Sequence, residues 1–586
     1  MRTHLCALAV SRVLVVLAPS AAVAQLQCSN TFEPITAQEW NDGANPGWNI
    51  GNTLDATPDE TSWGQPRVVN STITNVKSAG FRGIRIPITH QDHFISGAPD
   101  YILDPAWLDR IVEVLSYVTS QGLYALVNSH HDSWWLDPSN TALTADEKEE
   151  KYYRMWYQVA SRLACQSSKV AFEPLNEPSG QGEDGAGFLL RLHGAFYRAI
   201  ADAGGHNSKR VLVVGPLGNS WPNMVQYPGY PPDVENPVIL SYHFYGPWDF
   251  TATAWGRTWW GNDDDKANME SEIAQVRGNF TETPLHIGEM GVGPPSTETA
   301  ARWKWHDFLC RTAHKYNTSS FLWDAGGSFA DDTPWWTWRD LDPTTIRIIN
   351  TASQGIPNAL PDSTTDNQAS EAWTSAYLFH HQNETLGDKR LPFLWNGNTL
   401  LNVEVTRACN GSQPVTLVEG RDWEVDGNDL VVKEAFVSSV FPRGSNLGKK
   451  GSLLLQFDQG ADLTLEIFHW AASELGFDSF EVTQENKGQD LWIPIKWNGL
   501  NRVATVEAYK SDGVPLRDDW TIWMGPLQRG RLVNGNYEVD LTENRVAIRA
   551  EILQSVFDAG LTTNFRFEFH PRQPDVNFAN FTITVA

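Results

Sequence analysis

Cysteine is scarce in this chain: five occur among 586 residues, and none stands in the CxxC spacing of zinc and thiol-exchange motifs. No H-E-x-x-H motif is present, and no G-x-G-x-x-G stretch opens the first strand-to-helix turn. These absences count against a catalytic metal site of the H-E-x-x-H type and against a doubly wound, dinucleotide-binding sheet.

Positive charge is also in short supply. The chain has 44 Lys and Arg against 70 Asp and Glu, which gives a net charge of −26. Such a surface repels nucleic acid and anionic membranes at long range, so we expect neither as a partner. A neutral ligand fits this charge better.

Long apolar runs are missing after the N-terminus. The run "VLVVLAPSAAVA" follows Arg2 and Arg12 and ends in Ala22-Val23-Ala24, which is the pattern of a secretory signal cleaved before Gln25. It is too short to span a membrane comfortably. We therefore predict a signal peptide over 1–24 and a secreted, extracellular mature protein.

Two further features bear on export. Acceptor triplets for N-glycosylation occur at Asn70, Asn279, Asn317, Asn383, Asn410 and Asn580, although such triplets also arise by chance. The cysteines that remain after signal removal are Cys28, Cys165, Cys310 and Cys409. One or two disulfides, or free buried thiols, are all consistent with these four.

Tryptophan, in contrast, is abundant, with 26 copies, many of them in turn-rich segments. Flat rings on loops suit flat, weakly polar ligands such as sugars. The alternative is that a large core uses much tryptophan.

From about 45 to 355, short apolar runs alternate with polar loops and helical patterns. Eight buried strands alternating with helices predict a (β/α)₈ TIM barrel, an α/β fold; a doubly wound open sheet is the alternative. The runs are "GWNIGNTLDA", "FRGIRIPI", "LYALVNSH", "VAFEPLNEP", "RVLVVGP", "PVILSYHFY", "PLHIGEMG" and "SFLWDAGG".

A stretch within 355–370 is rich in proline and small polar residues, which predicts a linker. After it, apolar and polar residues alternate in short segments separated by turns, which indicates β-sandwiches. The second half repeats itself at offsets near one hundred residues: "WNGNTLLNVEV" resembles "WNGLNRVATVEA", and "KEAFVSSVF" resembles "RAEILQSVF". We expect a barrel over 25–355, a linker over 356–365 and related sandwich modules over 366–472 and 473–586.

The predicted barrel fold indicates which residues are candidate catalytic groups, because catalytic side chains in such barrels lie at the carboxyl ends of the strands. Strand four is expected to end at Asn176-Glu177 and strand seven at Glu289. Two carboxylates across a barrel mouth can flank a glycosidic bond, although each could instead pair with an arginine at the rim. Glu173, deeper in strand four, is expected to form a buried ion pair with Arg85.

The motifs "GWNIGNTLDA", "ETSWGQP", "FRGIRIPIT", "NSHH", "FEPLNEP", "HFY", "IGEMG" and "FLWD" together resemble glycoside hydrolase family 5, and the first two resemble its subfamily 4. The resemblance covers 45–355 in the right order. It implies a barrel that hydrolyses β-1,4-glucans or xyloglucans with retention of configuration.

The resemblance also implies roles for single residues. Glu177 matches the acid/base and Glu289 the nucleophile. Supporting or substrate-binding positions are matched by Arg85, His130, Asn176, His243, Tyr245, Trp323 and, within "GWNIGNTLDA", Asn52. No cofactor is implied.

The sequence "HHD" at 130–132 raises a metal hypothesis, since imidazole and carboxylate are common ligands. Neighbouring residues at a strand end are expected to point in opposite directions, so we favour no metal site.

Tryptophans cluster after the strand ends, where some would stack on sugars and others would fill space between loops. They are Trp134, Trp135, Trp221, Trp248, Trp255, Trp259, Trp260, Trp335, Trp336 and Trp338.

The two sandwiches resemble an immunoglobulin-like module followed by a family 46 carbohydrate-binding module. In the last module Trp520 and Trp523, with Trp492 and Trp497, are the candidate sugar contacts. Trp497 has a counterpart in the preceding module and is expected in the core, whereas Trp523 has none and is the better candidate.

These features favour a secreted, monomeric, retaining endo-β-1,4-glucanase that acts on plant cell-wall β-glucan, with xyloglucan and mixed-linkage glucan as further substrates. The alternatives are a family 5 hydrolase of another β-glycan, such as mannan, and an inactive carbohydrate-binding scaffold.

Overall fold

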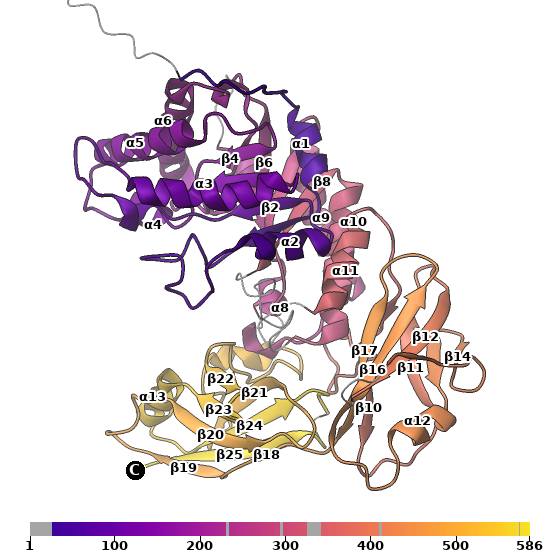
Figure 1. The fold of residues 1–586 in the computed structure, drawn as a ribbon. Helices are drawn as coiled ribbons and strands as arrows, with labels where there is room; N and C mark the ends of the chain where they lie inside the picture. The colour runs from indigo at the N-terminus through magenta and orange to yellow at the C-terminus, as the bar shows by residue number, and fades with distance from the viewer. Residues whose placement is uncertain are drawn as a thin grey trace, which may run out of the picture.

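The computed structural model describes residues 26–229, 234–252, 254–293, 297–324, 342–408, 413–573 and 575–586. The predicted signal peptide over 1–24 lies outside the described residues, as do Cys409, Trp335, Trp336 and Trp338. The described chain forms a barrel followed by two β-sandwiches (Figure 1).

Eight parallel strands close into a barrel in chain order, which confirms the TIM fold and excludes the open sheet. Nearly every strand residue is buried, as expected for parallel strands covered on both faces. The strands are β1 (Gly47–Ile50), β2 (Gly83–Ile86), β3 (Tyr124–Asn128), β4 (Val170–Glu173), β5 (Leu212–Val214), β6 (Val238–Phe244), β7 (Leu285–Met290) and β8 (Thr318–Asp324).

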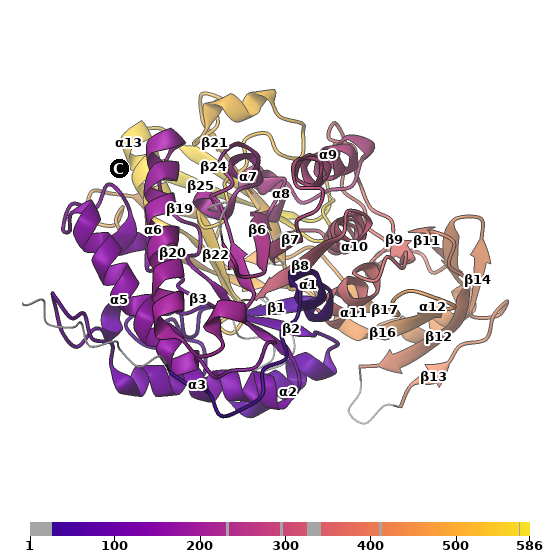
Figure 2. The same cartoon turned by 90° about the horizontal axis from the view of Figure 1, so that it is seen from above.

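Helices surround these strands, as the view from above shows (Figure 2). They are α1 (Ala37–Ala44), α2 (Asn70–Ser78), α3 (Pro105–Ser120), α4 (Ser133–Leu136), α5 (Ala145–Leu163), α6 (Gly182–Ala203), α7 (Trp221–Gln226), α8 (Trp248–Thr251), α9 (Asp263–Asn279), α10 (Thr299–Lys315) and α11 (Pro343–Ala352). Short 3₁₀ turns are η1 (Gln91–His93), η2 (Asn207–Lys209), η3 (Leu217–Asn219) and η4 (Ala254–Gly256). Among the described helices, none is both long enough and apolar enough to cross a membrane.

Local sequence sets the helix ends. Thr144 caps α5 in a reciprocal box with Glu147, and Asp104 caps α3 with proline in the first turn. A disulfide joins Cys28 to Cys165 and ties the N-terminal segment to the end of α5, while Cys310 is a buried free thiol. The disulfide and the free thiol establish the state of three of the four cysteines that the sequence left open.

The two sandwiches have the same plan. The second module contains sheets in the order β10-β17-β16-β12-β13 and β14-β15-β11-β9, and the third has β19-β25-β24-β21 and β18-β20-β23-β22. In each module one sheet begins with a parallel pair, β10 with β17 or β19 with β25, and one helix follows a strand of the other sheet, α12 after β15 and α13 after β23. This shared topology agrees with the internal repeat seen in the sequence.

The elements of the second module are β9 (Leu360–Pro361), β10 (Tyr377–His381), β11 (Lys389–Leu394), β12 (Leu400–Arg407), β13 (Val415–Thr416), β14 (Trp423–Asp426), β15 (Asp429–Val432), α12 (Glu434–Val440), β16 (Gly448–Phe457) and β17 (Leu463–Trp470). Those of the third are β18 (Glu474–Leu475), β19 (Ser479–Val482), β20 (Leu491–Lys496), β21 (Val503–Lys510), η5 (Asp519–Trp523), β22 (Tyr537–Asp540), β23 (Arg545–Ile548), α13 (Ala550–Ala559), β24 (Thr563–Phe569) and β25 (Phe578–Val585).

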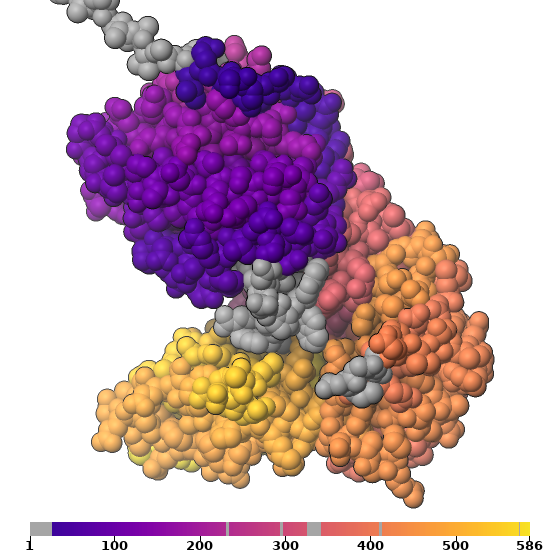
Figure 3. Space-filling view, viewed as in Figure 1, coloured from indigo at the N-terminus to yellow at the C-terminus, as the bar shows by residue number. Residues whose placement is uncertain are grey.

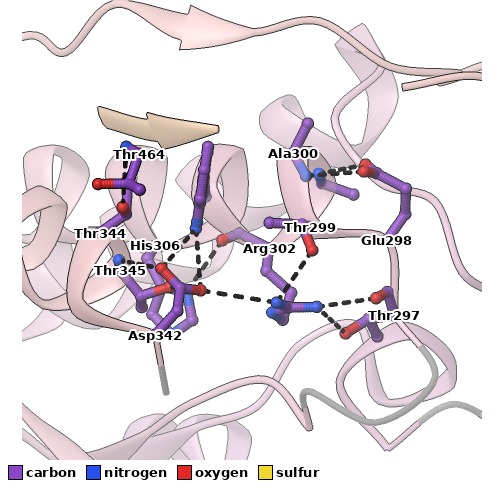
Figure 4. Close-up of polar contacts among 12 residues, drawn as sticks. Thr297, Glu298, Thr299, Ala300, Arg302, His306, Asp342, Thr344, Thr345 and Thr464 are labelled. Carbon is purple, nitrogen blue, oxygen red and sulfur yellow. Dashed lines mark hydrogen bonds and ion pairs between the residues drawn. The ribbon is translucent and has the colours of Figure 1, made fainter. Parts of the chain in front are cut away.

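The stretch predicted as a linker is packed. Leu360 is buried and β9 pairs with β11 of the second module. Asp342, before α11, accepts hydrogen bonds from the indole of Trp303 on α10 and from the backbone of Thr345, and Thr344 accepts one from the backbone of Thr464 in β17 (Figure 4). Ala300, Trp303 and Ile348 of the barrel also belong to the buried apolar core of the second module, so the two are joined by packed contacts that a flexible linker would not provide.

The third module turns back beneath the barrel, beside the second module (Figures 1 and 3). Arg572, fully buried, donates to the carbonyl of Gly256 at 3.3 Å and to the hydroxyl of Thr258 at 3.1 Å, both in the β6–α9 loop. Arg502 donates to the carbonyl of Thr297 at 2.9 Å, just before α10. The third module thus docks on loops that follow β6 and β7.

Candidate active site

The mouth of the barrel brings two carboxylates to one imidazole. Nδ1 of His243, near the end of β6, lies 2.8 Å from Oε1 of Glu177 and 3.5 Å from Oε2 of Glu289. One carboxylate or imidazole atom from each of these three residues lies within 4.8 Å of the other two. Residues more than a hundred positions apart in the chain thus form one compact cluster.

Glu289 is near the carboxyl end of β7, as the sequence predicts, and is 6% exposed. The register between β6 and β7 shifts between Tyr242 and His243, so that His243 lies opposite Glu289. Arg85 donates to Glu289 Oε1 at 2.6 Å, and the hydroxyl of Tyr245 donates to Oε2 at 3.1 Å. Both donors stabilise the ionised carboxylate.

The predicted end of strand four is wrong, because the strand ends at Glu173 and not at Asn176-Glu177. Pro174 follows Glu173 directly and has no N–H for the ladder, which explains why the strand stops there. Glu177 lies in the following loop with a left-handed φ of 41°, and its side chain is 49% exposed. The loop therefore presents Glu177 to solvent in the mouth, while Glu289 is shielded.

Glu173 has the structural role that the sequence predicts. It is 1% exposed and accepts from Nε of Arg85 at 2.6 Å and from Nη2 at 3.2 Å. The same guanidinium reaches Asn49 at 3.0 Å and Asn176 at 2.8 Å. Arg85 thus supports the nucleophile candidate and the deep glutamate together, and Asn49 is a partner that the sequence interpretation missed.

The orientation of Asn176 follows from its contact with Arg85. Its Oδ1 accepts from the guanidinium, so its Nδ2 is the group left to donate to a ligand. His130 is oriented in a similar way. The amide of Asn128 accepts from the Ile88 backbone and donates to His130 Nδ1, so the ring proton lies on Nε2.

Burial and neighbouring charge set the protonation states. Burial, with the positive charge of Arg85 nearby, lowers the pKa of His130 well below its ordinary value and keeps the ring neutral. Burial and the charge of Glu289 raise the pKa of Tyr245 well above its ordinary value, so the phenol remains a donor. Burial raises the pKa of Glu177, but the hydrogen bond with His243 and the charges of His243 and Arg85 outweigh it and hold the pKa below the ordinary value.

Two predicted residues lie at the edge of the cluster. Trp323, at the end of β8, is half-buried and stacks on His130 with ring centroids 5.7 Å apart and an interplanar angle of 10°. Asn52 is half-buried in the turn after β1, with a left-handed φ of 57°. The stacked pair presents flat surface beside the carboxylates.

The expectation that His130 and His131 point apart is wrong. Their ring centroids are 4.6 Å apart, and ligand-type atoms of Asp55, His130 and His131 lie within 4.8 Å of one another. β3 ends at Asn128, so strand alternation no longer applies to the two histidines. In this group Nδ1 of His130 accepts from Asn128 and Nε2 carries the proton, which leaves neither nitrogen free to bind a metal.

The described loop tryptophans divide into three sets. Trp134 and Trp248 are exposed by 48% and 66%, Trp221 and Trp255 are half-buried, and Trp135, Trp259 and Trp260 are buried. The rings of Trp63 and Trp134 both contact His131, which stacks on Trp134 with ring centroids 4.4 Å apart. The exposed set extends aromatic surface beyond the carboxylates, and the buried set packs the loops.

The comparisons with known proteins agree with this geometry. The family model described as "Cellulase (glycosyl hydrolase family 5)" matches residues 48–328. Endoglucanase B of Clostridium cellulovorans is 32% identical over 308 residues, which cover 50% of this chain and 69% of the relative.

The chain belongs to glycosyl hydrolase family 5. It is therefore a glycoside hydrolase, and the family 5 match spans all eight barrel strands.

The similarity extends beyond the catalytic domain. Endoglucanase B of Paenibacillus lautus is 27% identical over 94% of each chain. A solved tri-modular family 5, subfamily 4 endo-β-1,4-glucanase from Bacillus licheniformis, in complex with cellotetraose, is 28% identical, with a TM-score of 0.81 over 94% of this chain and 100% of that chain. A second family model, "Carbohydrate binding domain X2", matches residues 373–467 in the second module.

Proposed function

We propose that this chain is a retaining endo-β-1,4-glucanase in which Glu289 is the nucleophile and Glu177 the acid/base. The observation that carries the proposal is the close approach of the two carboxylates, each of which places one oxygen within 4.8 Å of the other. Retaining glycosidases have carboxyl groups about 5–5.5 Å apart, whereas inverting enzymes need about 6.5–9.5 Å to admit a water. The close approach of Glu177 and Glu289 favours the retaining arrangement.

In the first step Glu289 attacks the anomeric carbon and forms a glycosyl ester, while the glycosidic bond breaks and its oxygen takes the proton of Glu177. Arg85 and Tyr245 hold the attacking carboxylate through both of its oxygens. The remaining glucan chain leaves as a neutral alcohol.

In the second step Glu177, now ionised, takes a proton from water, the hydroxide attacks the anomeric carbon, and Glu289 leaves as carboxylate. The depressed pKa of Glu177 in the open site favours this basic form. Burial is the largest single influence on Glu177 and raises its pKa, and a sugar filling the mouth adds to that burial. Substrate binding thus favours the protonated form that the first step requires.

Three further side chains are proposed to contact the sugar. Nδ2 of Asn176 and Nε2–H of His130 are free to donate to hydroxyls, because the other polar atom of each residue is already bonded within the protein. Trp323 offers its ring face beneath the sugar. Asn52, in the turn after β1, is proposed as a further supporting residue.

A β-1,4-glucan is favoured as substrate by the endoglucanase relatives and by the cellotetraose complex of the Bacillus licheniformis neighbour. Exposed rings at Trp63, Trp134 and Trp248 suit a polymer that runs across the mouth. Xyloglucan and mixed-linkage glucan are proposed as further substrates, and mannan is the alternative glycan.

The third module is proposed to contact the polymer as well. Trp523 is 84% exposed and Trp520 lies in contact with Trp255 of the β6–α9 loop, with ring centroids 4.7 Å apart. Trp497 is buried, as predicted, and the guanidinium of Arg545 covers the ring of Trp492. Trp523 therefore offers the largest free ring surface of these four tryptophans.

We propose export for the mature chain, supported by the Cys28–Cys165 disulfide, because such bonds persist in oxidising compartments. Function as a monomer remains part of the same proposal, since all the catalytic groups come from one chain.

The test is replacement of Glu177 or Glu289 by alanine. Either variant should lose hydrolysis of soluble β-glucan and keep its circular dichroism spectrum, and full activity in either would refute the assignment. Proton NMR of the first product should show the β-anomer, whereas an initial α-anomer would exclude retention. Reducing-sugar release from β-glucan, xyloglucan, carboxymethylcellulose and mannan separates the candidate substrates, and inactivity on every one would favour a binding scaffold.

A further inference from the structure

The loop after β5, residues 215–220, lies between the Glu177 loop and β6. Its Gly218 N–H donates to the carbonyl of Pro178 at 2.8 Å, and Ser220 forms a backbone bridge with His243. One short loop therefore contacts the backbone on both sides of the Glu177–His243 hydrogen bond.

Asn219 in this loop is fully buried and is bonded to Glu177 itself. Its side-chain Oδ1 accepts the backbone N–H of Glu177 at 2.9 Å. The amide orientation follows from the chemistry, since only the oxygen can accept that N–H. Nothing else in the described hydrogen bonds accepts this N–H, so the contact fixes the peptide that carries the Glu177 side chain.

The backbone on both sides of this hydrogen bond is left-handed. Glu177 has φ 41°, Asn219 has φ 44° and Gly218 has φ 59°. A left-handed backbone is strained for residues other than glycine, and asparagine tolerates it better than most. Such a conformation at Glu177 persists only where surrounding contacts hold it, and the Asn219 amide is one of them.

The position of Asn219 is itself closely packed. A Cβ atom added at Gly215 would lie 2.6 Å from Nδ2 of Asn219, so only glycine leaves space for the amide at that point. Gly215 and Asn219 therefore act together to deliver one acceptor oxygen to Glu177.

We propose that Asn219 is a positioning residue for the acid/base, which holds the Glu177 backbone so that its carboxyl reaches the glycosidic oxygen. The inference rests on the proposed function and deepens it. Asn219 has no direct contact with the reacting atoms; it acts through the peptide of Glu177.

The test compares two substrates that differ in their need for a proton donor. Cellotetraose has a poor leaving group and needs acid assistance, whereas dinitrophenyl cellobioside forms the glycosyl ester without it. Asn219→Gly removes the acceptor and keeps the left-handed preference. Its kcat/KM should fall roughly 10- to 100-fold on cellotetraose, which is part of the 10²- to 10⁴-fold that acid–base catalysis typically contributes, and by less than about threefold on the dinitrophenyl substrate.

Azide provides a second readout, because it attacks the glycosyl ester without a general base. Azide should raise the steady-state rate of Asn219→Gly on the dinitrophenyl substrate and yield a β-glycosyl azide, and it should leave the wild-type rate unchanged. Gly215→Ala displaces the amide of Asn219 and should give the same selective loss, so the proposal stays testable should one variant fold poorly.

Asn544→Gly is the matched control, because Asn544 is another left-handed asparagine, with φ 50°, but exposed in the third module. It should match the wild type on both substrates. An equal loss on both substrates in Asn219→Gly and Gly215→Ala, or no loss on cellotetraose, overturns the positioning role. Failure of the proposed function looks different: Glu177→Ala would then retain cellotetraose hydrolysis.

Discussion

Replacing Glu173 by glutamine should damage the stability of the barrel far more than its chemistry. Arg85 is fully buried and donates five hydrogen bonds, two of them to Glu173. Glutamine can accept one of the two, but its NH₂ group would face the other guanidinium N–H. Removing one partner of a buried ion pair costs about 3–5 kcal/mol, and the contacts that Arg85 keeps place this variant near 3 kcal/mol.

The expected thermal shift follows from that free energy. The entropy of unfolding is about 2.1 cal/mol/K per residue, so a barrel of roughly 330 residues shifts its midpoint by about 1.4 °C per kcal/mol, and its transition should fall by roughly 4 °C. Calorimetry is the suitable assay, since three modules need not unfold in a single transition. The kcat on dinitrophenyl cellobioside should fall by less than about 100-fold, because the nucleophile Glu289 and its donors remain.

Glu289→Gln is the matched comparison. Like Glu173→Gln, it removes one negatively charged partner of Arg85, but it also removes the nucleophile. The kcat should therefore fall by about 10⁴-fold or more. If Glu173→Gln abolished activity to the same extent, or left the barrel transition unchanged, the assignment of Glu173 to support and Glu289 to chemistry would be wrong.

Three further results are expected. Although burial raises the pKa of Glu568, the charges of Arg572 and Arg531 bring it to about 2 from an ordinary 4.5; this stabilisation is present above about pH 4.5 and lost as the pH falls toward 2. Glu568→Gln should therefore remove about 3 kcal/mol of the acid dependence of the third module's free energy of unfolding, measured by denaturant unfolding across this pH range, and an unchanged acid profile would contradict this. Opening the Cys28–Cys165 bridge, which spans 137 residues, should cost about 5 kcal/mol in unfolding experiments on a Cys28→Ser, Cys165→Ser chain, and equal stability would exclude a structural role. Trp523→Ala should raise KM on β-glucan polymer with no change on dinitrophenyl cellobioside, and parallel effects on both substrates would argue against sugar contact.

The barrel was predictable because its signal is local and repeated. Buried parallel strands give short apolar runs, and the rule that chemistry lies at their carboxyl ends selects Glu289 without any structure. The pairing of Glu173 with Arg85 was predictable too, because a buried carboxylate needs a cationic partner and Arg85 is the charged residue within the apolar run of β2.

The geometry of Glu177 was not predictable from strand periodicity. Pro174 ends the strand, and beyond it side-chain directions depend on loop torsions such as the left-handed φ of Glu177. The same reason explains the error at His130 and His131, which lie past the end of β3. Asn219 carries no sequence signal at all, since its role depends on a loop that meets Glu177 only after folding.

The docking of the third module on the barrel could not be predicted from the internal repeat or from the composition of the sequence. Arg572 and Arg502 lie seventy positions apart in one module, yet they bond to the loops after β6 and β7, which follow Tyr245 and Glu289. Removing the module would therefore unpack loops attached to the active site as well as remove Trp523. Loss on a short aryl cellobioside would then report the unpacked loops, while any additional loss on polymer would report the missing sugar contact.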